Sequence, residues 1–179
     1  MSGETAPEVA FRSLRREDFA LVDHWFAQPH VAEWWPEHDL GIDAEASFGP
    51  AVDGREPTDV FVVECAGRAV GLVQRCALAD YPEYAAALGR ADGATIDYLI
   101  GEPDMVGVGI GPVLVDRFTA RTFDDLPGVD EVVVSVQQGN RRSWRALEKG
   151  GFTRVFAGMV ESGDPSDRGP SYVYVRRRR

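Results

Sequence analysis

Three glycines at alternate positions are the residues best suited by type and spacing to hold an anion. They lie in the segment Gly107-Val108-Gly109-Ile110-Gly111, directly before a predicted helix. Alternate glycines let the backbone turn sharply and approach a ligand without interference from Cβ atoms. Their N–H groups would then point toward an anion, together with the positive end of the helix dipole. The segment therefore predicts a pyrophosphate site; the alternative is that the glycines only form a turn.

The position of these glycines argues against two nucleotide-binding folds. A dinucleotide-binding fold places such glycines after its first strand, whereas here they follow the fourth predicted strand, at residues 95–100. A P-loop would require Gly-Lys followed by Ser or Thr, and the sequence contains no such tripeptide.

A second segment begins about thirty residues further on, at Asn140, and runs to Phe152. Asn140 is suited to cap the start of a helix at residues 140–149, and Gly150 or Gly151 is suited to end it. Capping alone would explain these residues. Their occurrence at this distance from the glycine segment favours a shared ligand site instead.

The elements that must position these segments alternate along the chain in a mixed α/β order. Periodicity and turn residues predict strands at residues 9–14, 59–65, 69–78, 95–100, 131–136, 152–160 and 171–175. Helices are predicted at residues 17–27, 112–123 and 140–149, with a weaker helix at 43–53. Residues 30–36 form an aromatic-rich turn or short helix that ends at a proline, and residues 80–92 form an acidic, partly helical insertion.

Length and composition fit one domain spanning residues 1–179, with flexible tails at residues 1–7 and 176–179. The chain has no run of eighteen apolar residues and no visible secretory signal, which favours a cytoplasmic protein. Cys65 and Cys76 lie in two strands predicted to form a hairpin, where they would face residues 70 and 59 respectively. We therefore expect reduced thiols rather than a disulfide.

The net charge of −10 restricts the partners of the chain. A chain this acidic is poorly suited to bind nucleic acid through phosphates. It suits a cationic small molecule, because acidic clefts concentrate cations, although acidity also serves solubility alone. We expect no nucleic-acid or membrane partner, and either a monomer or a homodimer.

The glycine segment resembles the acetyl-CoA pyrophosphate loop of the GNAT superfamily of N-acetyltransferases. The segment from Asn140 to Phe152 resembles that family's Asn-x-x-(Ala)-x-x-x-Tyr-Glu-Lys-x-Gly-Phe stretch. The resemblance covers nearly the whole chain. It implies the GNAT fold, with a central mixed, largely antiparallel twisted sheet of about seven strands flanked by helices. It also implies acetyl-CoA as co-substrate, no metal, and direct transfer of the acetyl group to an amine.

Within the superfamily, two further segments are similar to aminoglycoside 6′-N-acetyltransferases. His30-Val31-Ala32-Glu33-Trp34-Trp35 is similar to their His-x-x-Glu-Trp-Trp segment, and residues 95–100 resemble their strand with an Ile-Asp pair. The resemblance implies a role for Asp97 as general base or ammonium anchor, because a substrate amine must lose a proton before it attacks. Burial in an apolar strand should raise the pKa of Asp97. The alternative is that Asp97 caps nearby backbone N–H groups.

The resemblance also implies residues that bind each substrate. Main-chain groups of Leu99 and Ile100 would contact the pantetheine arm and the thioester carbonyl, and Asn140 would contact the other side of the pantetheine. The pyrophosphate would be bound by the backbone of Val106, Gly107, Val108, Gly109, Ile110 and Gly111. The acceptor amine would contact Trp34, Trp35, Asp80, Glu83, Tyr84 and Asp97. The sequence suggests only surface charges at Glu33, Asp92 and Asp164.

Two positions depart from the family pattern. The tyrosine that acts as general acid for the departing thiolate is replaced by Leu147, and an acidic residue that contacts the drug in the aminoglycoside subgroup is replaced by Ser135.

Three functions therefore remain open. The first is aminoglycoside 6′-N-acetylation. The second is acetylation of another amine, such as a polyamine, a peptide amine or a siderophore hydroxylysine. The Leu-Ile-Gly-Glu-Pro run resembles siderophore acyltransferases, without their histidine at Asp97. The third is acyl-CoA sensing without catalysis.

Overall fold

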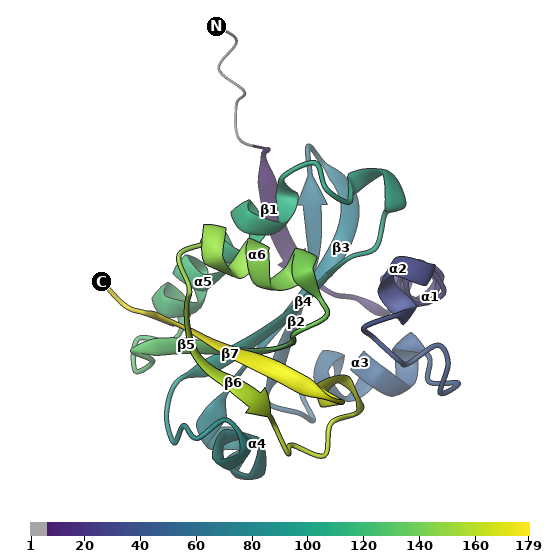
Figure 1. Ribbon diagram of the computed structural model, residues 1–179. Coiled ribbons are helices and arrows are strands. Elements are labelled where there is room, and N and C mark those ends of the chain that lie inside the picture. Colours follow the sequence, from purple (N-terminus) through teal and green to yellow (C-terminus); the bar gives the residue numbers. More distant parts are fainter. Residues whose placement is uncertain (1–6) are drawn as a thin grey trace, which may run out of the picture.

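A seven-stranded sheet forms the centre of the computed structural model, which describes residues 7–179 (Figure 1). The strand order is β1-β2-β3-β4-β5-β7-β6, and β4 and β5 are the one parallel pair among neighbours that are otherwise antiparallel. The strands are β1 Val9–Ser13, β2 Thr58–Cys65, β3 Arg68–Ala77, β4 Ala94–Ile100, β5 Glu131–Gln137, β6 Thr153–Met159 and β7 Pro170–Arg177. The predicted mixed, largely antiparallel sheet is confirmed.

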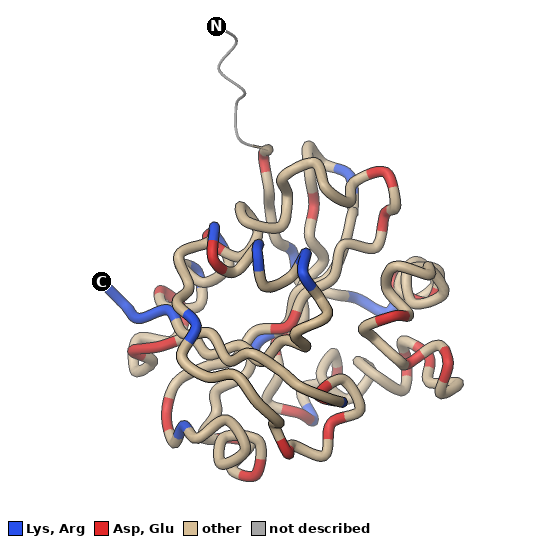
Figure 2. The backbone as a smooth tube through the Cα atoms, in the orientation of Figure 1, with Lys and Arg blue, Asp and Glu red and all other residues tan. Residues whose placement is uncertain are grey.

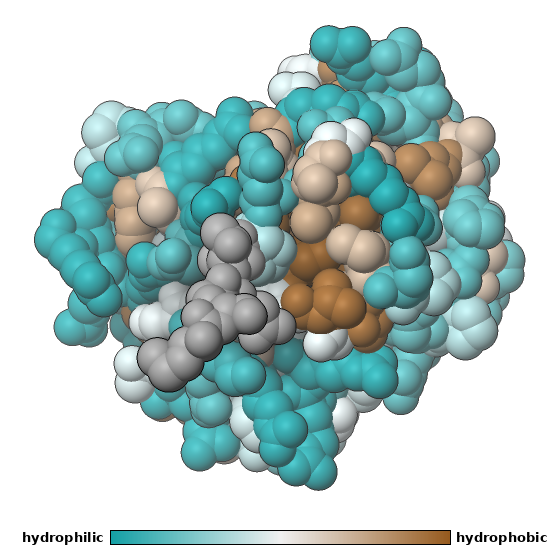
Figure 3. Space-filling model, turned by 90° about the horizontal axis from the view of Figure 1, so that it is seen from above, coloured by the Kyte–Doolittle hydropathy of each residue, from teal (hydrophilic) through white to brown (hydrophobic). Residues whose placement is uncertain are grey.

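Helices cover both faces of this sheet (Figure 1). On one face, α5 and α6 pack against the larger core cluster, and on the other α1 to α3 enclose a second cluster. The helices are α1 Phe19–Phe26, α2 Pro29–Ala32, α3 Ala44–Val52, α4 Pro82–Ala87, α5 Ile110–Asp125 and α6 Arg141–Lys149. Seen from above, the visible surface is mostly hydrophilic, with apolar residues gathered in one area (Figure 3). None of the helices in the described part of the chain is long and apolar enough to span a membrane.

The β2–β3 hairpin confirms that the cysteines do not pair but corrects their predicted register. Cys65 lies opposite Arg68 and Cys76 lies opposite Thr58, so the two thiols are at opposite ends of the hairpin and both are free. The register shifts between Val63 and Glu64 at a β-bulge, which sequence periodicity does not reveal.

Arg176, Arg177 and Arg178 are held by the fold, which corrects the prediction of a flexible tail for these three of residues 176–179. Arg176 and Arg177 belong to β7. The Arg178 guanidinium donates to the carbonyl oxygens of Phe123 at 2.8 Å and Val129 at 2.7 Å. Carbonyl groups in the last turn of a helix lack helical donors. Arg178 therefore satisfies one carbonyl group in the last turn of α5 and one in the loop that follows it. The tail predicted at residues 1–7 lies outside the described residues, apart from residue 7.

The sheet opens between β4 and β5. These strands pair only at Ala94 with Val132 and at Thr95 with Val133, and no pairing follows further along β4. One edge of β4 beyond Thr95 therefore has no neighbouring strand. The predicted glycine segment, Asp97 and Asn140 all belong to elements at this opening.

Candidate active site

Two cavities meet at the opening between β4 and β5. The larger has a volume of about 820 Å³ and includes Asp97, and the smaller, of about 290 Å³, includes the glycine segment. Five residues line both cavities: Trp34, Trp35, Tyr98, Asn140 and Ser143. A group bound in one cavity can therefore meet a group bound in the other at these residues.

The glycine segment forms one wall of the smaller cavity. Gly107 and Gly109 have φ values of 83° and 88°, the left-handed region in which glycine is favoured, and Gly109 directly precedes α5. A Cβ atom on Gly111 would lie 3.2 Å from the Ala146 Cβ, so this glycine allows α5 to approach α6 closely. The first N–H groups of α5 have no helical acceptor and remain available to an anion.

Not every residue of this segment turns its side chain toward the cavity. Val106 lines it together with the three glycines. The side chain of Val108 is exposed and that of Ile110 is buried in the core. Contacts from Val108 and Ile110 to a ligand can therefore come only from their main chain. The sequence analysis likewise predicted pyrophosphate binding by the backbone of these residues.

The main chain of β4 presents a different set of residues to the gap from the one predicted. Gly101 N–H donates to Val70 O at 2.8 Å, and the register of β3 with β4 then continues unshifted through residues 94–100. Hydrogen-bonded and non-hydrogen-bonded pairs alternate in an antiparallel ladder. Leu99 therefore pairs with β3, whereas the main-chain groups of Tyr98 and Ile100 face the gap. This corrects the prediction for Leu99 and adds Tyr98.

His30 already contacts one of these open groups. Its Nε2 lies 2.9 Å from the carbonyl oxygen of Ile100, and because a carbonyl oxygen can only accept, Nε2 is the donor. His30 also lines the smaller cavity. The contact fixes α2 to the open end of β4.

A basic face of α6 borders the smaller cavity and was missed by the sequence analysis. Arg142, Arg145 and Lys149 line it, and the basic residues of α6 are the blue segments of this helix in Figure 2. Their spacing of three and four residues places them on one side of a helix. In a chain with a net charge of −10, this spacing was the available signal for an anion site.

Asp97 lies in the larger cavity, as predicted, and its pKa is shifted. Burial raises the pKa of Asp97 to about 6, against a lowering by the hydrogen bond that Gln74 Nε2 donates to it at 3.2 Å. Nearby carboxylates, Asp164 first among them, raise this pKa further. Within residues 7–179 the partner of Asp97 is this side-chain amide and no backbone N–H, so the capping interpretation is wrong.

The larger cavity is strongly acidic. Its lining includes the carboxylates of Glu37, Glu56, Asp80, Glu83, Asp97, Asp164 and Asp167. Arg75 also lines it, but its guanidinium is paired with Asp59 at 3.0 Å and Asp125 at 2.8 Å. The charge of the cavity carboxylates is therefore not neutralised by Arg75, and the cavity is suited to hold several positive charges.

A carboxylate, that of Asp167, lies beside Ser135, the position at which the sequence departs from the acidic residue of the aminoglycoside subgroup. The Ser135 hydroxyl donates to Asp167 Oδ1 at 2.8 Å, and Ser162 donates to Oδ2 at 2.5 Å. Burial raises the pKa of Asp167, while these hydrogen bonds lower it. Asp164, which the sequence suggested to be a surface charge, is exposed but borders the same cavity.

Glu37 is a further carboxylate that sequence reasoning missed. Burial raises its pKa, and its Oε2 atom is buried without a hydrogen-bond partner in the described part of the chain. It follows the Trp34-Trp35-Pro36 run directly. A buried, unpaired carboxylate oxygen is costly unless a donor satisfies it, and a bound cation would be such a donor.

The other residues predicted to contact the acceptor also line the larger cavity. Asp80 and Glu83 are exposed there, and Tyr84 is partly buried. Trp34 and Trp35 both reach the cavity, and Trp35 also stacks on Phe26 with ring centroids 6.1 Å apart. The structure thus brings together all the residues predicted on this side. Among residues 7–179 no group of three or more side chains of the metal-binding types is positioned to hold a metal ion.

Comparison with known families agrees with this arrangement. The model of the acetyltransferase (GNAT) domain matches residues 15–158. The chain belongs to the GNAT acetyltransferase family. The match covers the glycine segment, Asp97 and α6, each of which lines one of the two cavities.

Individual relatives differ in the acceptor they are named for. The lysine N-acyltransferase MbtK of Mycolicibacterium paratuberculosis is 26% identical over 155 residues, which is 81% of this chain and 65% of that protein. The chain therefore spans less than two thirds of that relative's length.

Two solved structures share the fold over nearly the whole chain. The aminoglycoside acetyltransferase AAC(6′)-Ib in complex with coenzyme A and kanamycin has a TM-score of 0.75 and 25% identity, covering 96% of this chain and 95% of that chain. The spermidine N-acetyltransferase of Vibrio cholerae in complex with CoA and spermine has a TM-score of 0.69 at 18% identity, covering 94% and 95%. The second likeness concerns the fold alone.

Proposed function

We propose that the chain is an acetyl-CoA-dependent N-acetyltransferase for a small polycationic amine, with the 6′-amine of an aminoglycoside as the favoured acceptor. The observation that carries this proposal is an acidic cavity that meets the glycine-segment cavity beside Asp97 and Tyr98. The acidic cavity suits the acceptor, and the cavity with the glycines and the basic face of α6 suits the phosphates of acetyl-CoA.

Acetyl-CoA is bound, in this proposal, along the smaller cavity. The pyrophosphate accepts hydrogen bonds from the backbone of residues 106–111 and the start of α5. The pantetheine arm lies along β4, where the main-chain groups of Tyr98 and the N–H of Ile100 have no neighbouring strand, with Asn140 on its other side. The acetyl group then reaches the boundary that both cavities share.

Acetyl transfer needs a base, and Asp97 is that base. The ammonium form of the acceptor gives a proton to the Asp97 carboxylate, and the free amine attacks the thioester carbonyl carbon. As the C–N bond forms, the C–S bond breaks and its electron pair goes to sulfur, and the nitrogen, now cationic, loses its second proton to water to give the amide. Burial raises the pKa of Asp97 to about 6. The carboxylate is therefore ionised at neutral pH and more basic than an ordinary aspartate.

The size and charge of the larger cavity favour an aminoglycoside over a single-chain polyamine. A volume of about 820 Å³ lies in the upper part of the range usual for small-molecule sites. Carboxylates surround it on several elements, as a branched polyamine sugar requires, and Trp34 and Trp35 offer flat faces to sugar rings. A linear polyamine would fill only part of this space.

The acceptor class is tested by comparing kcat/KM for tobramycin, spermidine and Nε-hydroxylysine with acetyl-CoA as donor. We expect tobramycin to give the highest value, because only it places ammonium groups against carboxylates on all sides of the cavity. The mass of the acetylated product identifies the amine that reacts. A preference for hydroxylysine would contradict the aminoglycoside assignment and favour a siderophore hydroxylysine as the acceptor.

The basic face of α6 is expected to contribute to acetyl-CoA affinity. Replacing Arg145 and Lys149 together by alanine should weaken CoA binding roughly tenfold or more, because each loses a charge-assisted contact to phosphate. Isothermal titration calorimetry with CoA measures this change. Arg141→Ala is the matched control, since Arg141 lies on the same helix but outside the cavity. Equal affinities of the double variant and the control would contradict the assignment.

A further inference from the structure

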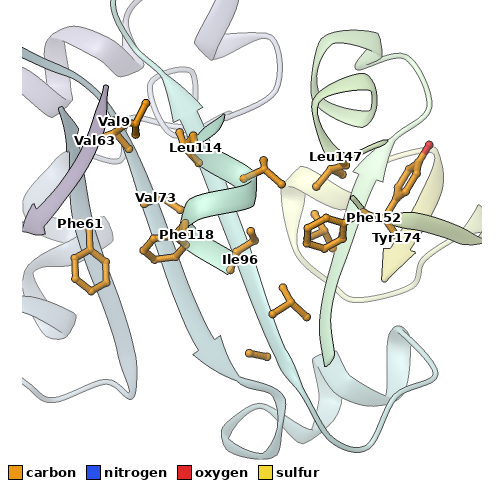
Figure 4. Packing of buried hydrophobic residues seen from close by; sticks show 14 of the residues in the cluster. Val9, Phe61, Val63, Val73, Ile96, Leu114, Phe118, Leu147, Phe152 and Tyr174 are labelled. Atoms are coloured by element: carbon orange, nitrogen blue, oxygen red, sulfur yellow. The ribbon is translucent and has the colours of Figure 1, made fainter. Parts of the chain in front are cut away.

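The family's usual proton donor for the departing thiolate has no counterpart in α6. Leu147 occupies that position, is fully buried and belongs to the main core with Phe152 and Tyr174 (Figure 4). It borders neither cavity. Any group that stabilises the thiolate must therefore come from another element.

A phenol reaches the same part of α6 from the sheet. The Tyr98 hydroxyl oxygen lies 2.8 Å from Ser143 Oγ and 3.1 Å from the Ser143 carbonyl oxygen. Ser143 lies in the first turn of α6, where its N–H donates to the side-chain oxygen of Asn140 at 3.2 Å. Two hydroxyl groups are thus held together at the N-terminal end of the helix.

This position is the one that a tyrosine in α6 would reach. Side chains on a helix lean toward its N-terminus, so a side chain at position 147 covers the residue one turn earlier, at position 143. In this chain Leu147 is turned into the core instead, and Tyr98 brings its hydroxyl to Ser143 from β4. The phenol is therefore supplied by a different element to the same region.

The hydroxyl pair also lies where the reacting groups must meet. Tyr98 and Ser143 are among the five residues that line both cavities. The other three are Trp34, Trp35 and Asn140, and the Asn140 side-chain oxygen is occupied by Ser143 N–H. An acetyl group that passes from one cavity to the other leaves its sulfur beside these two hydroxyls.

We propose that the Tyr98–Ser143 hydroxyl pair donates the hydrogen bond that stabilises the CoA thiolate as the C–S bond breaks. This inference rests on the proposed acetyl transfer. The amine's proton passes to Asp97, the electron pair of the C–S bond goes to sulfur, and the thiolate accepts the hydrogen bond from the pair. The nitrogen, which is cationic once the C–N bond has formed, loses its second proton to water, and the thiolate takes a proton from water. Asp97 also returns its proton to water, so one proton is released overall for each ammonium group that is acetylated.

The chemistry of the pair fits a donor of hydrogen bonds. Tyr98 and Ser143 share two contacts, and the Tyr98 hydroxyl can donate either to the Ser143 carbonyl oxygen or to Ser143 Oγ. When Tyr98 donates to Ser143 Oγ, the Ser143 hydroxyl proton is free to point into the cavities. Burial raises the pKa of Tyr98 above its ordinary value. The phenol therefore keeps its proton at neutral pH and can donate but not act as a base.

The test is the pKa of the CoA thiol in the binary complex, which requires no acceptor. Thiolate absorbance in the ultraviolet is titrated with pH for the CoA complex, and the desulfo-CoA complex is subtracted to remove the signals of Cys65, Cys76 and the tyrosines. The wild type should lower the pKa of the bound thiol by about one unit. Tyr98→Phe and Ser143→Ala should each abolish most of this shift, and Ser143→Thr should retain it.

Controls separate this function from a structural one. Tyr172→Phe removes a hydroxyl from a tyrosine outside both cavities and should leave the thiol pKa as in the wild type. Tyr98→Phe should bind CoA with unchanged Kd, whereas a purely structural contact would alter Kd or Tm. An unshifted thiol pKa in the wild type, or a thiol pKa in Tyr98→Phe and Ser143→Ala that is shifted as far as in the wild type, would overturn the proposal.

Turnover provides the second readout. With an acceptor that is acetylated, Tyr98→Phe should lower kcat roughly tenfold or more without changing the KM for acetyl-CoA. These measurements distinguish failure of the proposed acetyl transfer from failure of the proposed thiolate site. A shifted thiol pKa that depends on Tyr98, in a protein that acetylates no amine, would sustain the thiolate site and contradict the proposed function.

Discussion

Asp97→Asn is expected to lower kcat for acceptor acetylation by roughly a hundredfold to ten-thousandfold, the range associated with loss of a general base. Asparagine keeps the size of the side chain and an oxygen that can accept the hydrogen bond from Gln74, which lies 3.2 Å away. It cannot take a proton from the acceptor ammonium. Steady-state kinetics at saturating acetyl-CoA measures the loss.

The same variant carries a pH signature. Because the pKa of Asp97 is raised to about 6, kcat/KM of the wild type should fall as the pH drops through about 6 and level off above it. In Asp97→Asn, kcat/KM should no longer fall as the pH drops through about 6. A carboxylate whose folded pKa is raised destabilises the fold once it ionises, so Tm of Asp97→Asn at neutral pH should not fall.

Asp92→Asn is the matched control for Asp97→Asn, because Asp92 is exposed and outside both cavities. It should have wild-type kinetics. If Asp97→Asn retained wild-type kcat at neutral pH, Asp97 would not be the base, and the proposed proton transfer would be wrong.

Asp167→Asn is expected to raise the KM for a polycationic acceptor roughly tenfold to a hundredfold, with a smaller change in kcat. Its carboxylate is oriented toward the acidic cavity by hydrogen bonds from Ser135 and Ser162. Loss of a charge-assisted hydrogen bond in a partly buried site accounts for this magnitude. Asparagine preserves one acceptor oxygen, so folding should persist, as a Tm measurement would confirm.

Two comparisons decide the interpretation of this variant. Asp130→Asn removes a charge from a side chain that is 93% exposed and should leave KM unchanged. An acceptor with a single ammonium group should lose little affinity in Asp167→Asn, because it occupies only the Asp97 end of the cavity. Equal losses for singly and multiply charged acceptors would contradict a separate role for Asp167.

Local chemistry made much of the site predictable. The alternate glycines before α5, the Asn140 cap of α6 and the apolar strand around Asp97 are all signals carried by residues close together in sequence. The element order followed from periodicity for the same reason. The Asn140 side chain does accept from Ser143 N–H at 3.2 Å, as an N-cap should.

Contacts between distant parts of the chain account for what the sequence could not predict. Asp167 meets Ser135 across 32 positions and Tyr98 meets Ser143 across 45. No local periodicity encodes such pairs. The prediction that main-chain groups of Leu99 contact the pantetheine arm was wrong, because the direction of these groups depends on how β4 pairs with β3. A shift of one residue exchanges the main-chain groups that face β3 with those that face the gap.

The C-terminal arginines were mispredicted for a related reason. A run of like charges usually indicates a solvated tail, but here Arg178 lies under the end of α5, where three carbonyl oxygens accept from it. Those carbonyls belong to Phe123, Leu126 and Val129, more than forty positions earlier. Only the assembled fold brings them to the end of β7.

The most direct test of acetyl transfer to a polycationic amine is the initial rate of CoA-thiol release from acetyl-CoA, with and without tobramycin. The proposed function predicts release that depends on tobramycin, saturates with its concentration and is lost in Asp97→Asn. Release at the same low rate with and without tobramycin, in a protein that calorimetry shows to bind acetyl-CoA, would contradict it.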